Sequence, residues 1–160
     1  MWQLSGRRDH CETVMRNTPT AAKLTLDEVG HLVDTHFPEV HHGGRVLFID
    51  ALTDDGARVR LKSHPKNLRP GGTVSGPAMF TLADYGAYVA ILARLGEGGL
   101  QSVTTNINLN FMRRPQPGDV LGEIRLIKSG KRLIVAEIEM TSENDGALVA
   151  HAVATYIMPV

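Results

Sequence analysis

The chain of 160 residues has 17 basic and 17 acidic side chains, so its formal net charge is zero. This balance argues against a nucleic-acid-binding protein, which usually has a basic excess. The length predicts one domain, and a hydrophobic content of 42% is enough for a normal core. The single cysteine, Cys11, excludes an intramolecular disulfide and is typical of a reducing, cytoplasmic setting.

The chain begins with a polar segment that shows no clear periodicity. We therefore expect an N-terminal arm over residues 1–22 and a single domain over residues 23–160. The arm has no apolar core of the length that a signal peptide needs. Thr25 followed by Glu28 is a capping-box pattern, which predicts a short helix over about 26–36.

The rest of the chain reads as strands on both sides of one long apolar helix. An apolar run and an alternating run predict a hairpin at 46–52 and 57–62, with its turn at 54–56. Prolines and glycines predict a loop over 63–74. Further apolar or alternating runs predict four strands after the helix, at 103–111, 120–128, 133–141 and 147–158. This order predicts an α+β fold in which a curved antiparallel sheet wraps around the helix. An open sheet edge would invite pairing between subunits.

Asp84 is the only charged residue in the apolar segment 77–93. That segment is shorter than the roughly 20 residues of a membrane span, so we expect a core helix, buried nearly all round, and no membrane. An unpaired buried carboxylate costs several kcal/mol, so Asp84 is either functional or tied to a backbone N–H or an Arg. The Gly-rich turn at 70–77 would place free backbone N–H groups at the start of the helix. Together these features favour acid or base chemistry beside an oxyanion pocket.

The segment Ser75-Gly76-Pro77 stands nine residues before Asp84. With this order of elements, the pattern resembles the hotdog-fold acyl-CoA thioesterases, and the PaaI-like (phenylacetate-pathway) branch in particular. In that family a His-Gly-Gly motif precedes an Asp on the central helix by the same spacing. The segment SVTTNINLNFMRRP, residues 102–115, looks like the family's strand after that helix. The resemblance covers roughly residues 25–158 and implies a hotdog fold.

The resemblance also implies roles for individual residues. Asp84 would be the general base on a water molecule or the nucleophile, and the Gly76 N–H would polarise the thioester carbonyl. Thr104 or Thr105 would help to place the water; the match does not choose between them. The family's site is shared by two subunits, which implies a homodimer or a dimer of dimers.

The chain departs from the family pattern at three positions. Ser75 replaces the motif His, with a shorter reach and no titration near neutrality. Pro77 replaces the second Gly and has no N–H to offer. The family's Asn, six residues before the His, falls on Arg69 here, and a slip of two residues would align Asn67 instead.

Substrate-binding residues are expected from chemistry and proximity. Met79, Phe80, Tyr85 and Tyr88 are candidates for an acyl pocket because they are apolar and near Asp84. Basic residues suit the phosphates of coenzyme A, and the candidates are Arg113, Arg114, Lys128, Lys131 and Arg132. Coenzyme A would be part of the substrate and no other cofactor is expected. The seven His have no metal-ligand spacing, so no metal site is expected.

Two alternatives to hydrolysis stay open. A non-catalytic acyl-thioester binding protein would fit the loss of the motif His. A hydratase or dehydratase would need a His near Asp84, for which His64 is the candidate close in sequence. The HFP at 36–38 echoes hotdog dehydratases, but a hairpin separates it from the helix. The HHGG at 41–44 precedes a strand and is interpreted as a turn.

Overall fold

The computed structural model describes residues 24–159, so the expected N-terminal arm and Cys11 lie outside the described residues. The helical elements are α1 (Leu26–His36), η1 (Pro38–His41), η2 (Pro65–Asn67), α2 (Gly76–Leu95) and η3 (Gly96–Gly99). The strands are β1 (Leu47–Thr53), β2 (Gly56–Leu61), β3 (Leu68–Arg69), β4 (Thr73–Val74), β5 (Val103–Phe111), β6 (Val120–Ser129), β7 (Leu133–Ser142) and β8 (Leu148–Ile157).

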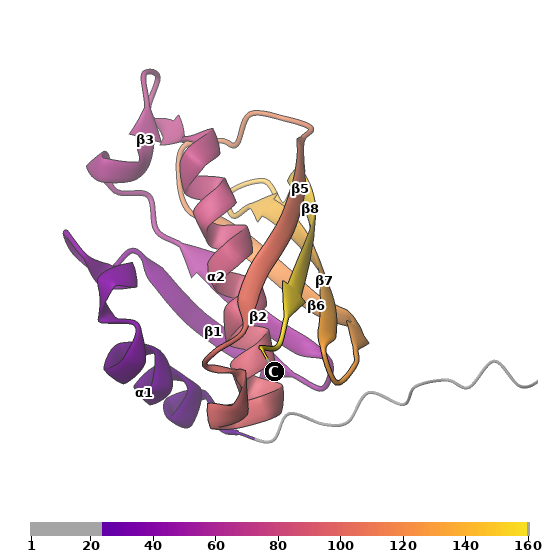
Figure 1. The fold of residues 1–160 in the computed structure, drawn as a ribbon. Helices are drawn as coiled ribbons and strands as arrows, with labels where there is room; N and C mark the ends of the chain where they lie inside the picture. Colours follow the sequence, from indigo (N-terminus) through magenta and orange to yellow (C-terminus); the bar gives the residue numbers. More distant parts are fainter. Residues whose placement is uncertain (1–23, 160) are drawn as a thin grey trace, which may run out of the picture.

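The main sheet has six strands in the order β1-β2-β6-β7-β8-β5, all antiparallel, and it curves around α2 (Figure 1). The predicted α+β hotdog arrangement, with one long helix held by a curved sheet, is thereby confirmed. The segment 63–74 is less irregular than predicted, because η2 and the small β3–β4 hairpin form within it. This hairpin turns through Gly71 and Gly72, both at positive φ, and delivers the chain to the start of α2.

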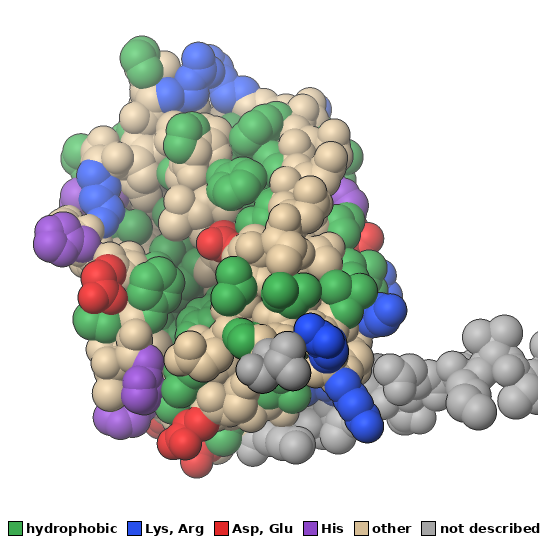
Figure 2. Space-filling view, viewed as in Figure 1, with side chains coloured by type: hydrophobic (Ala, Val, Ile, Leu, Met, Phe, Trp, Pro, Cys, Tyr) green, Lys and Arg blue, Asp and Glu red, His purple; other side chains and the backbone are tan. Residues whose placement is uncertain are grey.

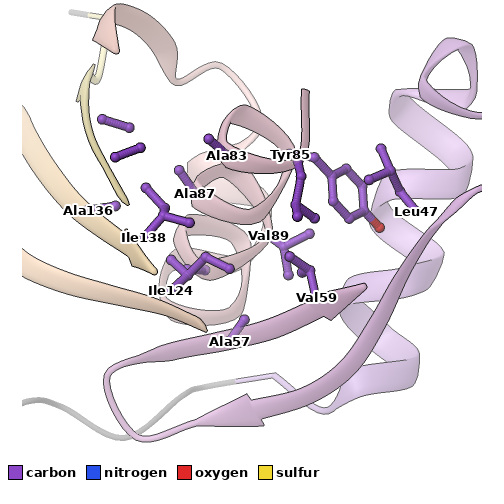
Figure 3. Close-up of a cluster of buried hydrophobic side chains, with 14 of the residues drawn as sticks. Leu47, Ala57, Val59, Ala83, Tyr85, Ala87, Val89, Ile124, Ala136 and Ile138 are labelled. Atoms are coloured by element: carbon purple, nitrogen blue, oxygen red, sulfur yellow. The ribbon is translucent and has the colours of Figure 1, made fainter. Parts of the chain in front are cut away.

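Small residues let α2 lie close to the sheet. A Cβ added at Gly86 would lie 2.6 Å from Ile124 Cδ1 and 3.1 Å from Val59 Cγ2, so a larger residue there would displace the Ile124 side chain. Ala83 and Ala87 are fully buried on the same helix. Figure 3 shows this helix between the strands, with Val59 and Ile124 packed beneath it. The buried face of α2 therefore fixes the position of the helix, including that of Asp84.

One face of α2 is not covered, which corrects the expectation of a helix buried nearly all round. Along this open face Phe80 is 44% exposed, Pro77 and Thr81 are exposed, and Asp84 and Tyr88 are half-buried. These positions recur at the spacing of one helical stripe. The expectation failed because no strand among residues 24–159 covers the apolar residues on this stripe. By length and composition the segment Gly76–Gly99 could cross a membrane, but it is the core helix here and is mostly buried.

Strand β5 forms one edge of the sheet beside this open face. It pairs with β8 on one side, and its other side has no partner among the described residues. Apolar side chains at its two ends are exposed, with Val103 at 53% and Phe111 at 56%. Figure 2 shows hydrophobic side chains gathered over this side of the molecule, with basic side chains above and below them.

Candidate active site

Asp84 is held from the sheet by two hydroxyl groups. Thr104 Oγ1 donates to Asp84 Oδ1 at 2.8 Å, and the Tyr156 hydroxyl lies 2.5 Å from the same oxygen. The Tyr156 hydroxyl is also 2.9 Å from the main-chain oxygen of Asp84. The partners of the carboxylate are thus hydroxyl groups, rather than the backbone N–H or Arg expected from the sequence.

The pairing register explains why these two hydroxyls meet. Thr104 and Tyr156 are directly opposite each other on β5 and β8, so both side chains project to the face that carries α2. Thr105, as the next residue of the strand, faces the other side of the sheet, and its Oγ1 donates instead to the main-chain oxygen of Thr155 at 3.1 Å. The structure therefore brings Thr104, and not Thr105, to Asp84.

A pocket of about 410 Å³ opens beside Asp84, on the open face of α2. It is lined by residues from α1, η1, α2, the η3–β5 connection, β5 and β8: His36, Phe37, Val40, Thr81, Asp84, Tyr85, Tyr88, Leu100, Ser102, Val103, Thr104 and Tyr156. We call it the Asp84 pocket. Phe37 packs edge-on against Tyr88, and the Tyr88 hydroxyl donates to the main-chain oxygen of Leu100 at 3.1 Å. An apolar, partly aromatic cavity with one carboxylate at its wall suits a small organic ligand.

The tyrosines of this pocket remain protonated donors. Burial, followed by the neighbouring Asp84 charge, raises the pKa of Tyr156 far above its usual range. Burial raises the pKa of Tyr85 to about 12 and also raises the pKa of Tyr88. The His41 ring packs against Tyr85, with 6.4 Å between the ring centroids. Its Nε2 lies 3.3 Å from Asp34 Oδ1, and burial lowers the pKa of His41.

The start of α2 forms a second, separate site. Ser75 caps the helix, and its Oγ accepts from the Ala78 N–H at 3.4 Å. Pro77 has no N–H, and no acceptor within residues 24–159 pairs with the Gly76 N–H. A Cβ at Gly76 would lie 3.2 Å from the Phe111 ring, so glycine lets this ring approach the helix start. The helix therefore offers one free N–H at its positive end.

A shallower pocket of about 370 Å³ lies over this helix start, and we call it the Gly76 pocket. Its lining combines exposed apolar groups with three arginines: Arg69, Val74, Gly76, Met79, Phe111, Met112, Arg113, Arg114 and Pro115. Asn67 supports it from behind, because its main-chain oxygen accepts from the Ser75 N–H at 2.9 Å and its Nδ2 donates to Lys62 O at 2.8 Å. The side chain of Asn67 is buried and holds the loop rather than lining either pocket.

The expected substrate-binding residues fall into three groups. Tyr85 and Tyr88 line the Asp84 pocket, whereas Met79, Arg113 and Arg114 line the Gly76 pocket. Phe80 is exposed on the open face of α2 and lines neither of these two pockets. The remaining basic candidates are exposed at and beside the β6–β7 turn, outside both pockets: Lys128, Lys131 and Arg132.

The histidines are arranged differently from the expectation. His64 is exposed, caps η2 by accepting from the Lys66 N–H, and does not line the Asp84 pocket. His36 and Phe37 do line it, although a hairpin separates them from α2 in sequence. The HHGG segment forms the end of η1 and a turn, as interpreted. Within the described residues no group of His, Cys, Asp and Glu is arranged to hold a metal ion.

Sequence reasoning missed Tyr156, which contacts the central carboxylate from 72 residues away. Its only signal was an apolar closing strand, whose inward positions hold alanines until this tyrosine. A tyrosine among small inward residues must find a partner for its hydroxyl, and the nearest polar group on the covered helix is Asp84.

Comparison with known proteins places this chain in a family. Residues 71–149 match the Thioesterase superfamily. The crystal structure of a candidate thioesterase from Silicibacter sp. TM1040 is 38% identical, with 89% of this chain and 97% of that chain covered and a TM-score of 0.78. A candidate esterase of Saccharolobus solfataricus, SSO1253, is 29% identical over 146 residues, which are 90% of this chain and 92% of that protein.

Zebrafish Thioesterase Superfamily Member 2 has the same fold, at 22% identity and a TM-score of 0.71, over 85% of this chain and 99% of that one. The chain is a hotdog-fold protein, and it belongs to the thioesterase superfamily. Its relatives support hydrolysis of thioesters as the general class of reaction.

Proposed function

We propose that this protein hydrolyses an acyl-CoA thioester to a free acid and coenzyme A, as a member of the PaaI-like branch. Asp84 acts as general base on water or as nucleophile, and the Gly76 N–H stabilises the oxyanion. The observation that carries the proposal is the pair of sites on α2. One has a carboxylate fixed by two hydroxyls in an apolar pocket, and the other has a free N–H at a helix start.

The two sites of one chain cannot act on one thioester. Asp84 follows Gly76 by eight residues in α2, and a rise of 1.5 Å per residue separates them by about 12 Å. A reacting carbonyl needs both groups at about 3 Å. A complete site therefore needs Asp84 of one subunit and Gly76 of the partner subunit, which supports a homodimer as the minimum assembly.

Pairing of two β5 edges would assemble such a site. In an antiparallel pair, the Val103 end of one β5 lies beside the Phe111 end of the other. Val103 and Thr104 line the Asp84 pocket, and Phe111 and Met112 line the Gly76 pocket. The pairing would thus place each Asp84 pocket against the Gly76 pocket of the partner subunit, and would cover the exposed apolar ends of β5.

The same assembly gathers the basic side chains. Arg113 and Arg114 follow one end of β5, whereas Lys131 and Arg132 lie near its other end, because Val103 and Leu133 both pair with Ile157. The nine residues of β5 separate these groups by about 27 Å in one chain. In the antiparallel dimer they would lie on one side of each composite site, where coenzyme A phosphates require positive charge.

The chemistry then needs three steps. Water, oriented by Thr104 and deprotonated at Asp84, attacks the thioester carbon, or Asp84 attacks it directly. Negative charge develops on the carbonyl oxygen, where one preorganised N–H is worth about 3–4 kcal/mol. The C–S bond breaks, and the thiolate of coenzyme A takes up a proton. If water was the attacking group, the acid is then released; if Asp84 was, a water molecule first hydrolyses the mixed anhydride formed on Asp84.

The test is release of free thiol from short, medium, long and aryl acyl-CoAs. Wild-type protein should turn over at least one of them, and Asp84→Asn should lower kcat at least about a hundredfold. Asp54→Asn, an exposed carboxylate in the β1–β2 turn, is the matched control and should leave kcat unchanged. No turnover of any substrate by folded wild-type protein would contradict the proposal.

One observation favours a second candidate, a non-catalytic acyl-thioester binding protein. Ser75, at the position of the family's His, uses its hydroxyl to cap α2. If the wild type binds acyl-CoAs without releasing thiol, and Ser75→His gains hydrolysis, this second function replaces the first.

A further inference from the structure

We infer that Tyr156 is a positioning residue for Asp84: its hydroxyl holds Oδ1 against the sheet, so that Oδ2 is the oxygen left to react. This inference rests on the proposed hydrolysis for its catalytic consequence, while the contact itself belongs to the fold. It assigns a role to a residue of β8 that lies outside the motif around α2.

The hydrogen bonds from Tyr156 to Asp84 cannot be equal, because a phenol has one proton. The hydroxyl is 2.5 Å from Oδ1 and 2.9 Å from the main-chain oxygen. Lengths of about 2.5–2.7 Å are typical of a hydroxyl that donates to a carboxylate, and such bonds are roughly twice as strong as neutral ones. The hydrogen bond to Oδ1, whose acceptor is charged, is therefore the stronger of the two.

Oδ1 is fully occupied by this arrangement. Thr104 and Tyr156 take the two lone-pair positions that a carboxylate oxygen offers in its plane. No side chain or backbone N–H within residues 24–159 donates to Oδ2. Since Asp84 lines the pocket, Oδ2 is the oxygen available to a water molecule or to a thioester carbon.

Tyr156 can donate a hydrogen bond to the Asp84 carboxylate without losing its own proton. Its ring is 3% exposed, and burial together with the Asp84 charge raises the pKa of its hydroxyl. It therefore donates throughout the physiological pH range and adds no titration of its own. Two hydroxyls from adjacent strands fix both the torsion and the tilt of the carboxylate, which a single donor would not.

The kinetic test is Tyr156→Phe, which removes the hydroxyl and keeps the ring. With the best acyl-CoA substrate, kcat should fall about ten- to a hundredfold, because a misplaced reacting group costs rate. KM should change less than about twofold, since the acyl pocket keeps its shape. Thr155→Val is the matched control: it removes a hydroxyl at the adjacent position of β8, on the opposite face, and should leave both constants unchanged.

The spectroscopic test does not depend on activity. In proton NMR of the wild type, the Tyr156 hydroxyl should give a slowly exchanging, strongly downfield signal. The signal should vanish in Tyr156→Phe, shift or vanish in Asp84→Asn, and persist in Thr155→Val.

The outcomes separate this inference from the proposed function. An unchanged kcat in Tyr156→Phe, beside a loss in Asp84→Asn, would overturn the positioning role. Absence of the downfield signal from the wild type, or its persistence in Tyr156→Phe, would overturn the contact. A folded wild type that releases no thiol would overturn the hydrolysis and the kinetic half of the inference. The orientation of Asp84 would then be decided by the signal alone.

Discussion

The two pockets on α2 differ in how they are built. The Asp84 pocket is lined by side chains from α1, η1, α2, β5 and β8, and its carboxylate is fixed by Thr104 and Tyr156. The Gly76 pocket combines a backbone N–H with exposed apolar groups and the guanidinium groups of Arg113 and Arg114. The first can hold and attack an acyl group, and the second can stabilise an oxyanion and attract phosphate.

Each pocket therefore has a group that the other lacks: the Asp84 pocket has a carboxylate, and the Gly76 pocket has a free backbone N–H. The chain has both halves of the proposed hydrolytic site, but the helix that positions each half also keeps them about 12 Å apart. Because both groups lie on α2, the helix separates Asp84 from Gly76 within one chain and would let the groups of two chains complement each other. In the proposed dimer, a second copy would cover the open face of α2 and the outer edge of β5.

The largest expected effect tests whether the two pockets act across subunits. Asp84→Asn and Gly76→Pro should each be nearly inactive as homodimers. The proline removes the N–H at the first helical position, where its backbone is tolerated, but its side chain makes the Phe111 ring shift; Gly76→Ala, which shifts the ring and keeps the N–H, is the control. After unfolding and refolding together, half of the dimers are mixed and each has one intact site. Activity per subunit should then recover to about a quarter of the wild-type value.

The control for this experiment is the pair mixed without refolding, which should stay inactive while subunits do not exchange. A refolded mixture with no gain over its parents would show that both groups serve one site within a subunit, or that one of them is dispensable. Either result would contradict the interpretation that the two pockets supply complementary groups across subunits.

A smaller effect should come from the cations of the Gly76 pocket. Replacing Arg113 and Arg114 together by Gln should raise KM for an acyl-CoA about tenfold, with kcat little changed, because these groups bind phosphate equally before and during reaction. A thioester of N-acetylcysteamine, which has no phosphates, should show no change. The difference between the two substrates should shrink at high salt. Equal losses on both substrates would assign the arginines to folding or assembly instead.

The last prediction compares the effects on kcat of removing two neighbouring hydroxyls, those of Thr104 and Thr105. Thr104→Val should lower kcat about tenfold, because it removes one of the two donors to Oδ1 and the group proposed to orient water. Thr105→Val should change kcat by less than about twofold, because its hydroxyl bonds to the main chain of β8 on the other face. Thermal unfolding of both variants controls for stability. A loss in Thr105→Val as large as that in Thr104→Val would contradict the assignment of Thr104 to Asp84, which rests on the pairing register of β5.

Local signals in the sequence determined most of the elements. The capping box at Thr25 and Glu28 begins α1 as predicted, and both of its hydrogen bonds form. The apolar run with Ser75 before it and Gly96 after it gives α2 nearly the predicted ends. The alternation along 103–111 is the observed β5. These features depend on neighbours a few residues apart, so they are visible in one dimension.

The sequence by itself determined that one carboxylate and one glycine N–H lie on a long apolar helix, and the spacing of that motif indicated the family. The tertiary structure decided which threonine reaches Asp84, because the pairing register of β5 with β8 turns Thr104 towards α2 and Thr105 to the other face. It brought Tyr156 to the carboxylate through the pairing of β8 with β5. It also left one face of α2 uncovered, although Pro77, Phe80 and Tyr88 on that face are apolar enough for a core. Composition shows which residues can be buried, but only the arrangement of the strands decides which are covered.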